Sequence, residues 1–145
     1  MKDENKNLAF RDEKSTVRPL VSVCISVYNR EDHLRKCLDS VVSQDISSME
    51  IVLVNDGSTD GTSEIMHEYQ NRFPEIRIIE QENRGLAQGR WMGVKNSSGR
   101  YITFLDADDY LLEGAYKTIL QFMENNKADI YEFQTIGEGL LWVFI

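Results

Sequence analysis

Runs of apolar residues alternate along this chain with segments whose apolar residues recur at helical spacing. The apolar runs are typical of strands and cover residues 20–27, 51–54, 76–79, 101–105 and 130–133. The helical patterns lie between them, over residues 34–42, 65–73, 85–96 and 112–123. Such alternation with short loops predicts right-handed crossovers that build a mostly parallel sheet with helices on both faces. The expected fold class is therefore α/β.

Composition limits what such a chain can do. With 145 residues, 41% of them hydrophobic, it can bury one ordinary core and fits one domain or a large part of one. A net charge of −8 and the lack of a Lys and Arg cluster argue against nucleic acid as a partner. Cys24 and Cys37 fall in a predicted strand and a predicted helix, so we expect buried thiols rather than a disulfide, in a reducing compartment such as the cytoplasm.

The two ends of the chain differ from its middle. Residues 1–18 are charged and unpatterned, which predicts a flexible tail without the apolar stretch of a signal peptide. No run approaches the ~20 apolar residues that span a bilayer. Residues 137–145 end in six apolar residues, which fit a strand of the sheet, an interface or a truncated terminus. If exposed, this segment predicts self-association, and peripheral contact with a membrane stays open.

Three polar segments directly follow three of the predicted strands. They are residues 28–30, 55–61 and 106–109. Ligands of parallel sheets bind at the carboxyl ends of the strands, so these segments should line one cleft. In the second segment Ser58 or Asp60 can cap the following helix, whereas Asp56, at a buried strand end, needs a hydrogen-bond donor to offset its desolvation.

The third segment carries Asp106, Ala107 and Asp108. On an extended chain, residues i and i+2 point the same way, so the two carboxylates would converge on one ligand. A hard divalent cation, Mg²⁺ or Mn²⁺, prefers oxygen ligands and would neutralise a diphosphate that the acids otherwise repel. The alternative is an acidic turn that caps the next helix.

Two further patterns concern the helices. Asn29 is well placed to cap the helix over residues 34–42. Gly85, Gly89 and Gly93 recur every fourth residue, which favours close packing of one helix face against the sheet. A phosphate-cradling loop is disfavoured, because the G-x-x-x-x-G-K-[ST] pattern is absent.

Taken together, residues 21–29, 54–60, 83–85 and 104–109 resemble family 2 glycosyltransferases in order and spacing. The resemblance covers roughly residues 19–135. It implies a GT-A fold, with residues 19–136 as a nucleotide-sugar-binding domain. It also implies a nucleotide-diphosphate-sugar donor, expected to be a UDP-sugar, a divalent cation, and transfer with inversion to a saccharide or lipid-linked acceptor.

The same resemblance implies roles for individual residues. The nucleotide-binding set would be Ser26, Tyr28, Asn29, Asp56, Arg90, Asp106 and Ala107, with Asp108 and Asp106 as metal ligands. Ser26 and the Tyr28 ring would line the base pocket, and Asp56 would accept from uracil N3–H. Arg90 would pair with phosphate, and Asp106 would meet the ribose or the metal.

The sequence also departs from the common family pattern. Ser26 stands where proline is frequent, Asn55 where aspartate is frequent, and Gly89 and Trp91 where alanine and asparagine are frequent.

Relatives continue into an acceptor half that carries the catalytic base, so no base is assigned here and the chain is interpreted as the donor-binding half. Two alternatives remain: a non-catalytic nucleotide-sugar-binding module, and a sugar nucleotidyltransferase, which the missing glycine- and lysine-rich phosphate loop disfavours. The expected location is the cytoplasm, including the inner face of the membrane.

Overall fold

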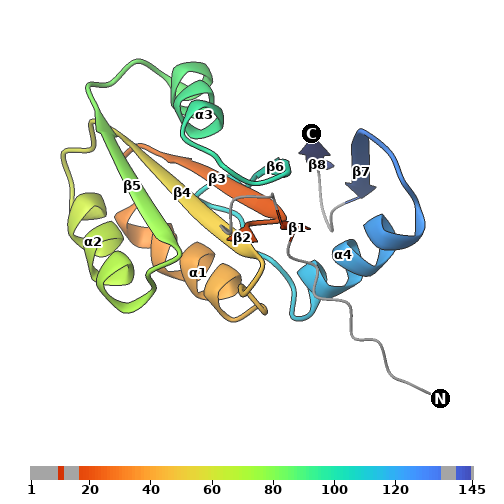
Figure 1. The fold of residues 1–145 in the computed structure, drawn as a ribbon. Coiled ribbons are helices and arrows are strands. Elements are labelled where there is room, and N and C mark those ends of the chain that lie inside the picture. Colours follow the sequence, from red (N-terminus) through yellow and green to blue (C-terminus); the bar gives the residue numbers. More distant parts are fainter. Residues whose placement is uncertain (1–9, 12–16, 135–139, 145) are drawn as a thin grey trace.

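One six-stranded sheet organises the part of the chain that the computed structural model describes, which is residues 10–11, 17–134 and 140–144. Its strands are β3 (Val21–Val27), β4 (Met49–Asp56), β5 (Ile76–Gln81), β6 (Tyr101–Phe104), β7 (Ile130–Gln134) and β8 (Leu140–Phe144). Their order across the sheet is β5-β4-β3-β6-β8-β7 (Figure 1). Neighbours from β5 to β6 are parallel, whereas β8 runs antiparallel to both β6 and β7. The predicted mostly parallel α/β sheet is confirmed.

Helices cover both faces of this sheet. They are α1 (Glu31–Val42), α2 (Thr62–Arg72), α3 (Leu86–Lys95) and α4 (Ala115–Asn125). Figure 1 shows α1 and α2 on one face and α3 on the other. Successive strand side chains point to opposite faces, so Val23 and Ile25 pack with α1, while Cys24 belongs to a second apolar cluster on the α3 face.

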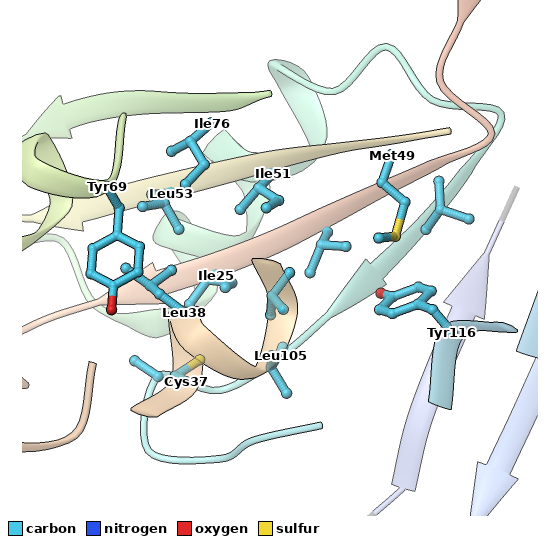
Figure 2. Close-up of a cluster of buried hydrophobic side chains, with 14 of the residues drawn as sticks. Ile25, Cys37, Leu38, Met49, Ile51, Leu53, Tyr69, Ile76, Leu105 and Tyr116 are labelled. Atoms are coloured by element: carbon cyan, nitrogen blue, oxygen red, sulfur yellow. The ribbon is translucent and has the colours of Figure 1, made fainter. Parts of the chain in front are cut away.

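The larger apolar cluster joins α1, α2 and α4 to the sheet (Figure 2). Ile25, Leu38, Ile51 and Leu53 are fully buried in it, and Tyr116 brings α4 into the same cluster. Burying each large apolar side chain stabilises the fold by about 1.5–3 kcal/mol. This packing fixes the strand ends that carry the polar segments.

The α3 face depends on glycine. A Cβ added to Gly89 would lie 2.0 Å from Ser26 Oγ, and one added to Gly93 would lie 3.1 Å from Cys24 Sγ. The predicted close packing of Gly89 and Gly93 is therefore confirmed. Gly85 differs from the prediction: it precedes α3 with a φ of +85° and has open space around it, so it turns the chain instead of packing.

The starts of α1 and α4 differ from the sequence prediction in ways that bear on named residues. α1 begins at Glu31 with Arg30 at its N-cap position and no side-chain cap, so the prediction that Asn29 caps this helix is wrong. Leu112 lies before α4 and is exposed, whereas the pattern placed it on the buried helix face. Both cysteines are buried free thiols, as predicted.

The ends of the chain are described in part. β1 (Phe10–Arg11) pairs antiparallel with β2 (Val17–Arg18), and the rest of the predicted tail before Val17 lies outside the described residues. Within the segment 137–145, the described residues Leu140–Phe144 form a strand, β8, which was one of the predicted alternatives. The side chains of that strand lie outside the described part, so self-association stays a prediction. Among the described residues, no helix combines the length and the apolar character needed to cross a membrane.

Candidate functional site

A pocket of about 420 Å³ lies at the carboxyl edge of the parallel strands. Ten residues line it: Ser26, Tyr28, Arg30, Asp56, Asn83, Gly85, Leu86, Asp106, Ala107 and Asp108. The polar segments that follow β3, β4 and β6 therefore converge as predicted. A fourth segment, residues 83–86, joins them from the turn between β5 and α3 and from the first residue of that helix.

Asp56 is the buried carboxylate at the end of β4, with only 2% of the residue exposed. Its Oδ1 accepts from Gln81 Nε2 at 2.6 Å and from the Arg84 N–H at 2.8 Å, and its Oδ2 accepts from the Gly85 N–H at 2.8 Å. The donors that a buried carboxylate requires are thus supplied by the last residue of β5 and by the turn before α3. Asp56 holds that turn in place and still faces the pocket.

Asn29 joins the segment after β3 to the loop after β4. With a φ of 49°, it donates its N–H to Ser58 Oγ at 3.0 Å, and its Oδ1 accepts from the Thr59 N–H at 2.8 Å. Asn29 is not among the pocket-lining residues. It connects the two loops that flank the Tyr28 ring and the end of β4.

The first turns of α1 and α2 bond to each other. Glu31 accepts from the Gly61 N–H at 2.6 Å, while Asp60 accepts from the N–H groups of Glu31 at 3.3 Å and Thr62 at 3.0 Å. Thr62 Oγ1 accepts from the Arg30 N–H at 2.9 Å. Carboxylates near helix N-termini are favourable, because they satisfy free N–H groups and offset the helix dipole. Neither predicted residue is the N-cap of α2, which is Gly61 without a side-chain cap. Asp60 precedes it and accepts from the Thr62 N–H, and Ser58 accepts from the Asn29 N–H.

The acidic segment does not continue the strand. β6 ends at Phe104, and the Asp109 N–H donates to the Asp106 carbonyl at 3.0 Å, which closes a turn. The prediction of an extended Asp106–Asp108 pair is therefore wrong. The alternative also fails, because α4 begins only at Ala115 and the acids do not cap it.

Each carboxylate of the pair contacts a different arginine. Asp106 Oδ1 accepts from Arg90 Nη2 at 2.7 Å, and Asp108 Oδ2 lies 3.5 Å from Arg30 Nε. Both side chains are about half exposed, at 48% and 51%. Arg90 thus lies behind Asp106 and does not itself line the pocket, in contrast to Ser26, Tyr28 and Ala107.

Charge accumulates around this turn. Burial, together with the negative charges of Asp106 and Asp108, raises the pKa of Asp109 above its usual value. Burial and the same three carboxylates raise the pKa of the Cys37 thiol to about 12. The turn is therefore a place where positive charge is favoured.

The donor set suits a shared divalent cation. Across the described residues, no group of three or more His, Cys, Asp or Glu side chains could hold a metal ion by itself. Asp106 and Asp108 offer carboxylates at the pocket wall, and Mg²⁺-like cations commonly keep several water ligands and take the rest from a substrate phosphate. The residues fit a cation that the protein and an anionic ligand hold together.

Fold and site together define an α/β protein with a ligand-sized, acid-lined pocket at the carboxyl edge of its sheet. Residues 22–140 match the family model for glycosyl transferase family 2, and the chain belongs to that family. It is 41% identical over 129 residues to glycosyltransferase GlyA of Streptococcus pneumoniae, covering 86% of this chain and 18% of the relative. It is 41% identical over 112 residues to the uncharacterized glycosyltransferase EpsJ of Bacillus subtilis, covering 77% of this chain and 33% of the relative.

Solved structures agree on the fold, which is that of GT-A glycosyltransferases. S. aureus TarS, in complex with UDP-GlcNAc, aligns with a TM-score of 0.71 at 29% identity over 76% of this chain and 32% of that one. A mannosyltransferase from Pyrobaculum calidifontis, in complex with GDP-Man and Mn²⁺, aligns with a TM-score of 0.76 at 21% identity over 89% of this chain and 45% of that one. The chain thus spans a third or less of the length of the two curated relatives.

Sequence reasoning missed several parts of the site, among them the pocket-lining Asn83 and Leu86. Arg30 was part of the segment after the first strand, but it received no role. Gln81 and the N–H groups of Arg84 and Gly85 hold Asp56 through contacts that no local pattern reveals. The one available signal was the rule that a buried carboxylate requires donors, which predicts partners without naming them.

Proposed function

We propose that this chain binds the nucleoside-diphosphate part of a sugar donor, with UDP as the nucleotide and Mn²⁺ or Mg²⁺ as the cation. In the whole enzyme, the donor sugar would pass with inversion to the hydroxyl of a saccharide or lipid-linked acceptor. One observation carries the proposal: a single pocket brings together an aromatic ring, a buried carboxylate and two exposed carboxylates, from Tyr28, Asp56, Asp106 and Asp108.

Each residue has a role that its chemistry supports. Tyr28 is 45% exposed, so a flat base can stack on its ring. Asp56 Oδ2 accepts a bond from Gly85 and keeps a lone pair, which would accept from uracil N3–H. Ser26 and Ala107 complete the walls of the nucleotide site, and Asn29 and Arg90 hold the walls in position.

Asp108 would be a ligand of the cation. Asp106 would bind either the ribose or the same cation. When bound, such a cation stabilises negative charge on a leaving diphosphate. Arg90 fixes Asp106 through the 2.7 Å pair, so that this carboxylate stays oriented toward the pocket. The cytoplasm, including the inner face of the membrane, is the compartment we propose, because two buried free thiols persist under reducing conditions.

Competition binding tests this proposal. Labelled UDP is dialysed to equilibrium against the protein with Mn²⁺ present, and unlabelled CDP or GDP is added as competitor. We expect UDP to bind and both competitors to be weaker, because cytosine lacks the N3–H donor and guanine is larger. Equal competition by GDP would reject the uracil assignment, and no UDP binding would reject the donor site.

Tyr28→Ala tests the role of the Tyr28 ring in the same binding experiment, and Tyr110→Ala is its control. Loss of the stacking face should weaken UDP binding roughly tenfold, since stacking contributes ~1–3 kcal/mol per base. Tyr110→Ala removes a similarly exposed tyrosine that lies outside the pocket, with Lys36 Nζ over its ring, and should leave binding unchanged. Wild-type affinity in Tyr28→Ala would contradict the role of this ring.

A further inference from the structure

Arg30 is the only cationic residue among those that line the pocket within the described part of the chain. Its main chain is fixed, because its N–H donates to Thr62 Oγ1 at 2.9 Å. Its side chain is held more loosely: Nη1 donates to the Asn29 carbonyl at 3.1 Å and to the Tyr28 carbonyl at 3.5 Å, and Nε lies 3.5 Å from Asp108 Oδ2. A fixed backbone with a half-exposed guanidinium allows the side chain to change partners.

The partner that Arg30 contacts is the carboxylate on which the proposed cation would lie. A guanidinium and a divalent cation repel each other and compete for the same carboxylate oxygens. A cation on Asp108 would therefore release Arg30 from it. The other two lining carboxylates have separate partners, since Asp56 is held by the turn before α3 and Asp106 by Arg90.

A released Arg30 lies at the wall of a pocket proposed to hold an anionic diphosphate. A guanidinium is suited to phosphate, because its planar fork donates two hydrogen bonds at once. The Asp108 pair by contrast is long and half exposed, so it stabilises little and is readily exchanged.

We propose that Arg30 is a diphosphate-binding residue that exchanges Asp108 for a phosphate oxygen when a cation and a nucleoside diphosphate bind. This inference rests on the proposed function of the pocket. It makes Arg30 a competitor of the cation before the nucleotide binds and a ligand of the nucleotide afterwards. Removing the guanidinium should therefore have opposite effects on the two ligands.

The test uses Arg30→Gln in the full chain, with two readouts that do not depend on sugar transfer. Electron paramagnetic resonance of free Mn²⁺ measures cation binding without nucleotide. Calorimetry at saturating Mn²⁺ measures binding of UDP and of uridine, which has the base and ribose but no phosphate. Arg35→Gln is the matched control, because Arg35 lies on α1, is also about half exposed and pairs with Glu68 away from the pocket.

We expect Arg30→Gln to bind Mn²⁺ about threefold more tightly, the size of a surface ion pair. It should bind UDP about tenfold more weakly, the size of a charge-assisted hydrogen bond, with uridine binding unchanged. Arg30→Lys, which keeps the charge, should retain most of the UDP affinity, and Arg35→Gln should match the wild type.

The outcomes separate this inference from the proposed function. One outcome is that the wild type binds Mn²⁺ and UDP while Arg30→Gln binds each of them with wild-type affinity. In that case the role of Arg30 is rejected and the donor site stands. Equal weakening of UDP and uridine would also reject it, because the side chain would then act on the base or on the fold. If the wild type binds neither ligand, the donor site itself is rejected.

Discussion

Glu50 illustrates how a single residue can fix a distant segment. It is 8% exposed, lies near the start of β4, and accepts from Ser22 Oγ at 2.5 Å and from Ser98 Oγ at 2.8 Å. It also accepts from the main-chain N–H of Ser98 and, at 3.1 Å, from that of Gly99. The carboxylate thus orders the connection between α3 and β6, at the end of the sheet opposite the pocket.

Glu50 also predicts how stability depends on pH. Burial alone would raise the pKa of this carboxyl, but the hydrogen bonds from Ser22, Ser98 and Gly99 lower it below its ordinary value of 4.5. Because folding lowers the pKa, the carboxylate contributes its full stability above the ordinary value. That contribution is lost as the pH falls through the folded pKa.

We expect Glu50→Gln to lower the free energy of unfolding by about 2 kcal/mol at neutral pH, because it replaces charge-assisted hydrogen bonds. The deficit relative to wild type should shrink well below pH 4.5, where Glu50 itself becomes neutral. Urea unfolding between neutral pH and values well below pH 4.5 measures the difference in unfolding free energy between wild type and variant. Glu124→Gln, at an exposed position, is the control. A deficit that stays constant with pH would show that charge at Glu50 is not the cause.

At the scale of elements, the contact between β3 and α3 sets the geometry of one pocket wall. Ser26 and Gly89, both departures from the common family pattern, face each other across this contact. Arg90 follows Gly89 directly and reaches Asp106. The depth at which α3 packs on the sheet therefore decides where Arg90 lies.

This contact predicts that positions 26 and 89 are coupled. Gly89→Ala should destabilise the fold by ~1–2 kcal/mol, because overpacking outweighs the better helix propensity of alanine. Adding Ser26→Ala removes the closest atom, Ser26 Oγ, and should recover about 1 kcal/mol as a coupling energy.

Denaturant unfolding of the double-mutant cycle measures this coupling. Ser22→Ala is the matched control, because Ser22 lies on the same strand but faces Gly99, so its coupling to Gly89→Ala should be near zero. Equal coupling at positions 22 and 26 would show that the effect is general loosening of β3, not a specific contact.

Across the whole molecule, the sequence was sufficient to predict those elements whose position depends on local pattern. β3, β5 and β6 form almost where the apolar runs predicted, because a short apolar run bounded by polar residues favours a strand that packs into the core. β4 is longer than its apolar run because Glu50 and Asp56 extend it, and both depend on partners far along the chain. The position of β8 between β6 and β7 likewise depends on pairing with β6, a strand from an earlier part of the chain.

The site was predicted by position more reliably than by conformation. The rule that ligands bind at carboxyl strand ends brought Tyr28, Asp56 and Asp106 to one pocket. The turn at Asp106 and the contact between Arg30 and Asp108 depend on side chains from different segments, which strand periodicity does not encode. Local sequence thus located the pocket, and tertiary contacts set its electrostatics.

The most direct test of the account is a calorimetric titration of UDP with and without Mn²⁺, into the wild type and Asp108→Asn. We expect wild-type binding that requires Mn²⁺ and loss of most of that affinity in Asp108→Asn, because the shared cation loses its charged ligand. Asp129→Asn, an exposed acid far along the chain, should bind as the wild type does. UDP affinity that is the same without Mn²⁺ and in Asp108→Asn would contradict the claim that this pocket holds a cation and a diphosphate together.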